Sequence, residues 1–409
     1  MLDVLRTPAV LRTSRIGRVG RDCSYPLSIV VDERALAERL ISYDTSRPEE
    51  LAAAAAFVKG WLEAREIEVR EHAHNGLPVL VADVGADGDD GPTVLLHGHL
   101  DVVPGHEEQY EPRVEGDRLI GRGAYDMKGG LAAMMCAVKD CAEQRDVKVR
   151  FLCVPDEEAE DVDQRSTDEL VRAGMRADFA ITGEPTNLHI GIEAKGVLAM
   201  RIEVSGRAAH GSTPWLGDSA VLKAFDVFRR IEAMDFARES SELFDRPSIN
   251  LGRIEGGDVF NKVPDRCEMV VDVRYLPGQD PGAILAQIRA LPDVTVTKTL
   301  MRAPAHVERT NPYVRALRDA AARTTEGEAL SVGRDGASDA ISFLEAGIPA
   351  VEFGPTGGGH HGPEEWVSIA SLRSYREALT AFVRTLPEWL ARERTVGPGG
   401  LTAIEGGLA

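Results

Sequence analysis

Short apolar runs that end in histidine or carboxylate residues constrain the fold of this chain more than any other feature. Residues 92–96 lead into His97-Gly98-His99-Leu100-Asp101, residues 147–154 lead into Asp156-Glu157-Glu158, and residues 178–182 lead into Gly183-Glu184-Pro185. Short β-prone runs bounded by turns are typical of buried strands. Because open α/β sheets carry their chemistry at the carboxyl ends of their strands, we expect these polar side chains to meet at one edge of a sheet.

Segments with helical periodicity alternate with these strands, and this alternation indicates an α/β fold. The Gly-rich turn 85–91 predicts a hairpin. The remaining predictions for this part of the chain are helices over 36–41, 51–62, 126–143, 165–173, 311–323, 338–346 and 369–392, and strands over 67–71, 78–84 and 349–353.

From Lys195 the pattern changes to longer, alternating strands. They are expected at 197–205, 247–254, 267–275 and 293–299, with helices near 217–233 and 280–290. This β-α-β-β-α-β order predicts a small α+β, ferredoxin-like domain inserted into the first. The predicted division is a catalytic domain of 32–195 plus 303–392, an inserted domain of 196–302, a disordered extension of 1–31 and a flexible tail of 393–409.

Composition excludes several classes of function. The formal net charge of -19 argues against nucleic acid and anionic membranes as partners, because either requires a basic surface. No apolar run has the length of a transmembrane helix, so we expect a soluble protein. The 5 cysteines include no Cys-x-x-Cys pair and fit reduced thiols in a cytoplasmic protein. Residues 1–31 are rich in arginine but lack the apolar core of a secretory signal; a transit peptide is the alternative.

The polar residues at the predicted strand ends form a set with the composition of a metal site. They are His99, Asp101, Asp126, Glu157, Glu158, Glu184 and the pair His360-His361. Imidazoles and carboxylates in these numbers suit divalent zinc, and the surplus of carboxylates suggests two metals that share a bridging ligand. Without cations, burial of so many acids would cost several kcal/mol. Each acid alone could equally be an ordinary surface residue.

A two-metal site with an additional carboxylate suggests hydrolysis, in which the metals activate water and a glutamate moves protons. Glu157 and Glu158 are adjacent and cannot easily bind the same metal. One of them should be a ligand and the other the base.

Four motifs resemble the co-catalytic zinc family of acetylornithine deacetylase, succinyl-diaminopimelate desuccinylase and glutamate carboxypeptidase. The first two are His97-Gly98-His99-Leu100-Asp101-Val102-Val103-Pro104 and Gly121-Arg122-Gly123-Ala124-Tyr125-Asp126-Met127-Lys128-Gly129-Gly130. The others are Asp156-Glu157-Glu158 and Gly183-Glu184-Pro185, and the resemblance runs from about residue 32 to 390. It implies a zinc-peptidase-like sheet flanked by helices, with an inserted dimerisation domain.

The resemblance also implies roles for these residues. His99 and Glu184 would bind one zinc, Glu158 and a late histidine the other, and Asp126 would bridge them. Asp101 would orient His99, and Glu157 would be the general base. The family's late motif matches His361-Gly362-Pro363-Glu364-Glu365-Trp366, so we expect His361 rather than His360 to be the ligand.

Further matches concern the substrate. By the resemblance, His210 in Gly206-Arg207-Ala208-Ala209-His210-Gly211-Ser212 would reach across a dimer to stabilise the oxyanion, and Asn261 and Arg274 would bind a substrate carboxylate. Ser338 matches a loop on the substrate side. Taken alone, His210 suits a turn, Arg274 a salt bridge on a strand face, and Ser338 a helix N-cap.

The sequence therefore predicts a metal-dependent hydrolase that cleaves the amide bond of an N-acyl amino acid. We expect two Zn²⁺ per subunit, with Co²⁺ or Mn²⁺ as alternatives, a small-molecule substrate, a homodimer and a cytoplasmic location. A dipeptidase or glutamate-type carboxypeptidase is the enzymatic alternative, and a non-catalytic relative that binds metal or ligand is the alternative outside enzymes. The sequence does not define the acyl group.

Overall fold

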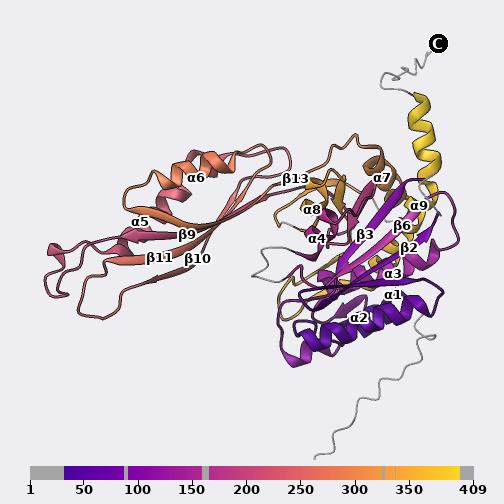
Figure 1. Ribbon diagram of the computed structural model, residues 1–409, viewed down its shortest axis with the longest axis horizontal. Coiled ribbons are helices and arrows are strands. Elements are labelled where there is room, and N and C mark those ends of the chain that lie inside the picture. Colours follow the sequence, from indigo (N-terminus) through magenta and orange to yellow (C-terminus); the bar gives the residue numbers. More distant parts are fainter. Residues whose placement is uncertain (1–31, 87–90, 159–164, 325–327, 337, 397–409) are drawn as a thin grey trace, which may run out of the picture.

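Two larger sheets and a small third one organise the chain (Figure 1). Each predicted strand has a counterpart close to its predicted position, but the strands Ile190–Ala194, Ala305–His306 and Ser331–Arg334 of the larger sheet were not predicted. The computed structural model describes residues 32–86, 91–158, 165–324, 328–336 and 338–396. The predicted extension of 1–31 lies outside these residues, as does most of the predicted tail. No helix among the described residues combines the length and apolar character that a bilayer crossing requires.

The larger sheet brings the three polar strand ends together. Its central strand β3 (Thr93–His99) runs parallel to β6 (Lys148–Val154) on one side and to β7 (Phe179–Thr182) on the other. The carboxyl ends of all three strands therefore meet at one edge, as the sequence predicted. The sheet also contains β1 (Val69–His74), β2 (Leu77–Gly85), β8 (Ile190–Ala194), β13 (Ala305–His306), β14 (Ser331–Arg334) and β15 (Ala350–Glu352).

The hairpin predicted at 85–91 is wrong in its pairing. The strands on either side, β2 and β3, are not neighbours, because β6 lies between them and pairs with both. Across the β2–β6 pair, Arg150 donates to the two carboxylate oxygens of Asp83 at 2.7 and 3.0 Å. A turn signal shows where the chain reverses but does not define which strand becomes the partner. Residues 87–90 lie outside the described residues.

Helices cover the larger sheet near the predicted positions. They are α1 (Glu33–Ile41), α2 (Pro48–Glu63), α3 (Gly129–Asp140), α4 (Ser166–Arg172), α7 (Pro312–Thr324), α8 (Ala340–Glu345) and α9 (Ile369–Val396). α3 packs against β3, α1 and α9, and all its residues from Gly129 to Val138 are buried. α9 continues past residue 392, where we expected the flexible tail to begin.

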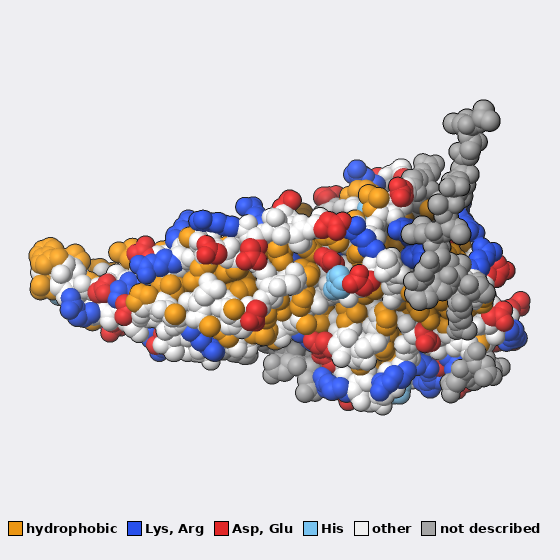
Figure 2. All heavy atoms as spheres, turned by 90° about the horizontal axis from the view of Figure 1, so that it is seen from above, with side chains coloured by type: hydrophobic (Ala, Val, Ile, Leu, Met, Phe, Trp, Pro, Cys, Tyr) orange, Lys and Arg blue, Asp and Glu red, His pale blue; other side chains and the backbone are white. Residues whose placement is uncertain are grey.

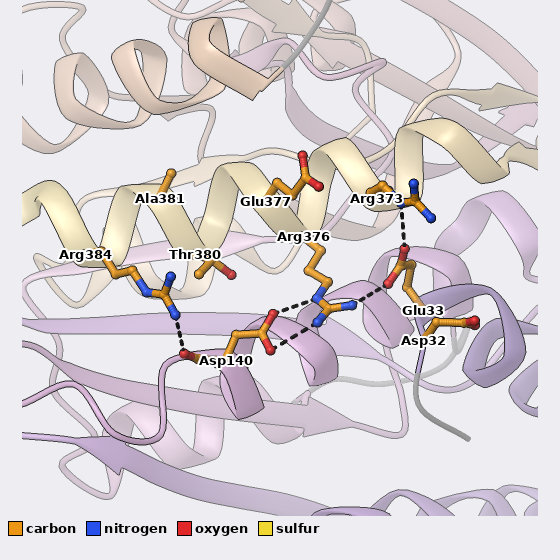
Figure 3. A pocket seen from close by; sticks show the side chains of 9 residues that line it. All are labelled: Asp32, Glu33, Asp140, Arg373, Arg376, Glu377, Thr380, Ala381 and Arg384. Carbon is orange, nitrogen blue, oxygen red and sulfur yellow. Dashed lines mark hydrogen bonds and ion pairs between the residues drawn. The ribbon is translucent and has the colours of Figure 1, made fainter. Parts of the chain in front are cut away.

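A charged groove joins α1, α3 and α9 (Figure 3). Arg376 of α9 donates to both carboxylate oxygens of Asp140 at 2.7 and 3.0 Å and to Glu33 at 2.8 Å. Arg384 donates to the Asp140 backbone carbonyl at 2.9 Å. Because Arg376 pairs with Asp140 and with Glu33, this groove ties the three helices together.

The second sheet forms the inserted domain. β9 (Gly196–Ser205), α5 (Ala220–Glu232), β10 (Ser248–Gly256), β11 (Arg266–Tyr275), α6 (Pro281–Arg289) and β12 (Val294–Arg302) follow in the predicted order. The strands pair antiparallel in the order β10-β11-β9-β12, a ferredoxin-like arrangement. Alternate residues of β9 and β11 pack with both helices into a separate core. The predicted α/β fold with an inserted α+β domain is confirmed.

Shorter elements complete the chain. A small sheet contains β4 (Arg113–Glu115), β5 (Arg118–Ile120), β16 (Gly357–Gly358) and β17 (Trp366–Ser368). Short helical segments are η1 (Glu107–Tyr110), η2 (Ala124–Lys128), η3 (Pro214–Leu216) and η4 (Asp235–Arg238). β5 and β17 place η2 next to the loop that carries His360 and His361.

Candidate metal centre

One group of potential ligands gathers around His99 at the end of β3. The His99 side chain is fully buried, and its Nε2 lies 3.0 Å from Asp126 Oδ1 and 3.9 Å from Glu184 Oε1. Asp126 belongs to η2, and Glu184 is the second residue after β7. Three segments far apart in the sequence thus place one nitrogen and two carboxylates together.

The second carboxylate oxygen of Asp126 faces the late histidines. Asp126 Oδ2 contacts His360 Nε2 and lies 3.3 Å from His361 Nε2. His361 Nε2 is also 2.9 Å from Glu158 Oε1. Asp126 therefore stands between two groups of donors with one oxygen toward each, which is the arrangement that a bridging ligand requires.

The donor set fits divalent metal ions. Three groups of donor atoms each lie within 4.8 Å of one another: Asp126 with His360 and His361, His99 with Glu157 and Glu158, and His99 with Asp126 and Glu184. Glu184 Oε1 is buried and has no hydrogen-bond partner among the described residues. Imidazole and carboxylate are the ligands that zinc and its neighbours prefer, and a cation would satisfy this oxygen.

In the protein without metal ions, the pKa values of several proposed ligands are raised, so that these groups bind protons more readily. Burial and the charge of Asp126 raise the pKa of Glu184 well above its ordinary value. Burial opposes protonation of His99, but its carboxylate neighbours raise its pKa well above the ordinary value. Hydrogen bonds to Asp126 and Glu158 raise the pKa of His361 to about 10. Bound divalent cations would replace these protons and reverse the shifts.

Asp101 contacts His99 mainly through its backbone. The Asp101 carbonyl oxygen lies 3.0 Å from His99 Nδ1, whereas its carboxylate is 3.6 Å away. The carboxylate instead accepts the backbone N–H groups of Glu157 at 3.2 Å and Glu158 at 2.8 Å. With its proton on Nδ1, His99 presents Nε2 to the site, and the same aspartate holds the loop that carries both glutamates.

His97 points to different neighbours. Its Nε2 lies 3.2 Å from Thr167 Oγ1 and 3.3 Å from Asp339 Oδ2, and its ring packs edge-on against Phe343. None of the three donor groups includes it. Its surroundings are those of a structural residue beside the site.

The adjacent glutamates diverge. Glu158 faces His361, whereas Glu157 Oε1 accepts a hydrogen bond from Arg165 Nη1 at 2.5 Å. Burial raises the pKa of Glu157 to about 8, against the opposing effect of Arg165. A carboxylate with a pKa near neutrality can both accept and return a proton.

A cavity of about 410 Å³ connects the donors with the inserted domain. Its walls include Asp126, Glu157, Glu158, Glu184, His360 and His361 from the first domain, and Val197, Arg274, Leu300 and Arg302 from the second. Ser338 also lines it, and its hydroxyl donates to Glu352 at 2.7 Å. This volume suits a small molecule.

His210 and Asn261 lie elsewhere in the chain. Neither lines the cavity, and both belong to exposed loops of the inserted domain. His210 Nδ1 is 2.8 Å from Ser212 Oγ, and the Asn261 carbonyl accepts the N–H of Gly211 at 2.7 Å. Within this chain, these two predicted residues are not brought to the metal ligands.

Sequence reasoning missed a buried carboxylate that positions Asp126. Glu365 accepts the backbone N–H groups of Gly123 at 3.1 Å, Tyr125 at 3.0 Å and Asp126 at 3.0 Å, and the guanidinium of Arg122 at 2.8 Å. Its place in the late motif was visible, but no sequence signal indicated that it holds η2. The roles of Arg165 and of Asp339, which follows Ser338 in a matched segment, were missed for the same reason, because their contacts are distant in sequence.

Comparisons with known proteins agree with this geometry. A model of the peptidase family M20/M25/M40 matches residues 95–385. A Pyrobaculum aerophilum protein named as a candidate LysW-lysine/LysW-ornithine hydrolase is 33% identical over 305 residues, covering 74% of this chain and 84% of the relative. Acetylornithine deacetylase of Myxococcus xanthus is 33% identical over 290 residues, covering 68% and 75%. The metallo-carboxypeptidase Sso-CP2 of Sulfolobus solfataricus superposes with a TM-score of 0.72 at 20% identity, covering 87% and 99%.

Proposed function

The chain belongs to the peptidase family M20/M25/M40, whose members are metal-dependent hydrolases of amide bonds, and from this premise we propose that it is a zinc-dependent deacylase of N-acyl amino acids. The family resemblance inferred from the motifs is thereby confirmed, as is the assignment as an enzyme. The proposal concerns the metal, the substrate and the role of each residue.

One observation carries the proposal: the metal-type donors, Glu157 and Arg274 line the same small cavity. Arg274 lies on β11 of the inserted domain, across the cavity from the metal-type donors. Its Nε donates to Asp272 of the same strand at 2.9 Å. This pairing leaves the terminal nitrogens of the guanidinium available for a planar carboxylate. A substrate that bridges the cavity would have a carboxylate at one end and an amide bond near the donors.

The proposed ligands divide into two sets that share Asp126. His99 and Glu184 would hold one Zn²⁺, Glu158 and His361 the other, with His360 as the alternative histidine. When bound, the two ions supply the Lewis acidity that activates water and polarises the amide carbonyl. Co²⁺ or Mn²⁺ would suit the same donors.

Residues of this chain transfer the proton, orient the metal ligands and bind the substrate. Glu157 accepts the proton of the attacking water and returns it to the leaving nitrogen. Asp101 orients His99 and the glutamate loop through the contacts described above. Arg274 binds the substrate carboxylate, and Ser338 contributes a hydroxyl to the wall of the cavity.

We further propose that the enzyme acts as a homodimer in which His210 and Asn261 serve the partner's cavity. Large hydrophobic side chains are exposed in their loops: Trp215 at 75%, Leu216 at 61%, Val259 at 54%, and Phe260, which is fully exposed. Figure 2 shows hydrophobic side chains gathered at the end of the inserted domain farthest from the larger sheet. Such patches on one molecule favour a protein contact, and a second copy would remove them from water.

We also propose a cytoplasmic location, which the free and buried state of Cys136, Cys141, Cys153 and Cys267 supports.

A dipeptidase or carboxypeptidase is the second candidate, because Arg274 would bind the carboxylate of a peptide equally well. Hydrolysis of acetyl-, succinyl- and aminoacyl-amino acids should be measured with the zinc-loaded protein and with the chelated protein. We expect metal-dependent release of the amino acid from an acyl substrate. Preference for aminoacyl substrates would favour the peptidase, and no metal-dependent hydrolysis of any of them would contradict both.

A further inference from the structure

Arg165 lies between the loop that carries Glu157 and Glu158 and the buried Asp339. It stands at the N-cap of α4, lines the cavity, and has a side chain that is 23% exposed. Its Nη1 donates both to Glu157 Oε1 at 2.5 Å and to Asp339 Oδ1 at 2.7 Å. One guanidinium nitrogen therefore ties Glu157 to a second carboxylate.

The second carboxylate is itself fixed. The Asp339 side chain is fully buried at the start of α8, and its Oδ2 accepts the Thr167 hydroxyl at 2.5 Å. His97 Nε2, from the central strand β3, lies 3.3 Å from the same oxygen. Glu157 is thus anchored through Arg165 to two helices and a core strand.

Arg165 contacts only one of the two adjacent glutamates among the described residues. Donor atoms of His99, Glu157 and Glu158 lie within 4.8 Å of one another, so both carboxylates are within reach of one metal position, although the sequence argued that adjacent glutamates would not easily share a metal. Arg165 has a hydrogen bond with Glu157 and none with Glu158 among the described residues. With Oε1 of Glu157 held, its remaining oxygen is available for a proton, while Glu158 turns to His361.

We propose that Arg165 is a positioning residue that keeps Glu157 out of the metal coordination sphere and so separates the base from the ligand. This inference rests on the proposed function, in which Glu157 is the base. The ion pair between Arg165 and the buried Asp339 holds the guanidinium in place. Through Arg165, which is neither a metal ligand nor the base, Glu157 and Glu158 acquire distinct roles.

The test compares Arg165→Met with Arg165→Lys and with Arg172→Met, a matched control on the same helix whose side chain is 56% exposed. We expect Arg165→Met to lower kcat about 100-fold with little change in KM, because small displacements of a reacting group have effects of this size. Metal content should be unchanged, and the absorption spectrum of the cobalt-substituted protein should shift as Glu157 joins the ligands. Arg165→Lys should recover much of the loss, and Arg172→Met should resemble the wild type in every measurement.

A second comparison separates this inference from the proposed function. If Arg165 acts through Glu157, Arg165→Met should cause no further loss of kcat in a Glu157→Gln background. Equal losses in both backgrounds, a rise in KM alone, or an unchanged cobalt spectrum would overturn the inference. Full activity of Glu157→Gln itself would instead overturn the proposed base. If Arg165→Met does not fold, Asp339→Asn tests the same anchor and should lower kcat with metal retained; full activity of that variant would also overturn it.

Discussion

The two halves of the proposed site differ in how completely one chain builds them. At the edge of the larger sheet, His99, Asp126 and Glu184 are buried, and their donor atoms lie within 4.8 Å of one another. In the inserted domain, the loops of His210 and Asn261 are exposed and lie outside the cavity. The difference teaches that a single chain brings the proposed metal ligands together, whereas under the proposed dimer the other half would come from a second molecule.

The largest effect should come from the metal half. We expect His99→Ala to lose metal and essentially all activity, because His99 joins two of the three donor groups. His97→Ala provides the matched control two residues earlier on the same strand, and it should retain its metal. Metal analysis of the purified variants checks both. Equal metal loss in the two variants would remove the distinction between ligand and structural histidine.

The next largest effect on activity should come from the residues of the proposed site that belong to the inserted domain. His210→Ala should lower kcat by roughly 10²–10³-fold, the usual result of removing one oxyanion donor, without changing metal content. Steady-state kinetics and metal analysis measure this. Unchanged kcat would show that the exposed half takes no part in the reaction.

Mixing two inactive variants asks whether His210 acts in the partner's site. In a mixed dimer of His210→Ala and Glu157→Gln, one cavity would contain both an intact Glu157 and an intact His210 from the other chain. Random exchange of subunits should therefore restore about a quarter of the wild-type activity. No recovery in a mixture that sedimentation shows to contain mixed dimers would mean that His210 acts only within its own chain.

A smaller effect is expected where the two halves meet at the cavity. Arg274→Met should raise KM and lower kcat/KM about 10- to 100-fold, equivalent to the loss of a charged hydrogen bond. Arg253→Met, on strand β10 of the same domain and outside the cavity lining, serves as the matched comparison for folding. A change in kcat alone would contradict a binding role for Arg274.

The smallest effect on activity should come from the charged groove of Figure 3. Arg376→Met breaks its ion pairs with Asp140 and Glu33 and should lower the free energy of unfolding by about 1–3 kcal/mol. Denaturant unfolding measures the loss, and kcat should be unchanged. A large loss of activity in the folded variant would show that this groove communicates with the cavity.

The sequence predicted the parts of the molecule that depend on local pattern. Apolar runs followed by His99, Glu157 and Glu184 placed these residues at strand ends, and parallel pairing then brought them together. The insertion of β6 between β2 and β3 was not predictable from the turn between them, because strand order depends on packing across the whole sheet.

Contacts between segments that lie far apart along the chain could likewise not be predicted from the sequence. Nothing in the motifs indicated that Asp101 would meet His99 mainly by its carbonyl, or that Glu365 would hold the backbone at Asp126. The ion pair of Arg165 with Asp339 joins two helices that lie far apart along the chain. Both His360 and His361 contact Asp126, so the choice of His361 as ligand stays a prediction.

Glu157→Gln tests the central claim most directly, because the change removes the proton acceptor and preserves the size of the side chain. Metal content and kcat should be measured on the same preparation beside the wild type. We expect the full complement of metal in both proteins and a loss of about 10²–10⁴-fold in kcat in the variant. Wild-type kcat in a fully metal-loaded variant would contradict the account.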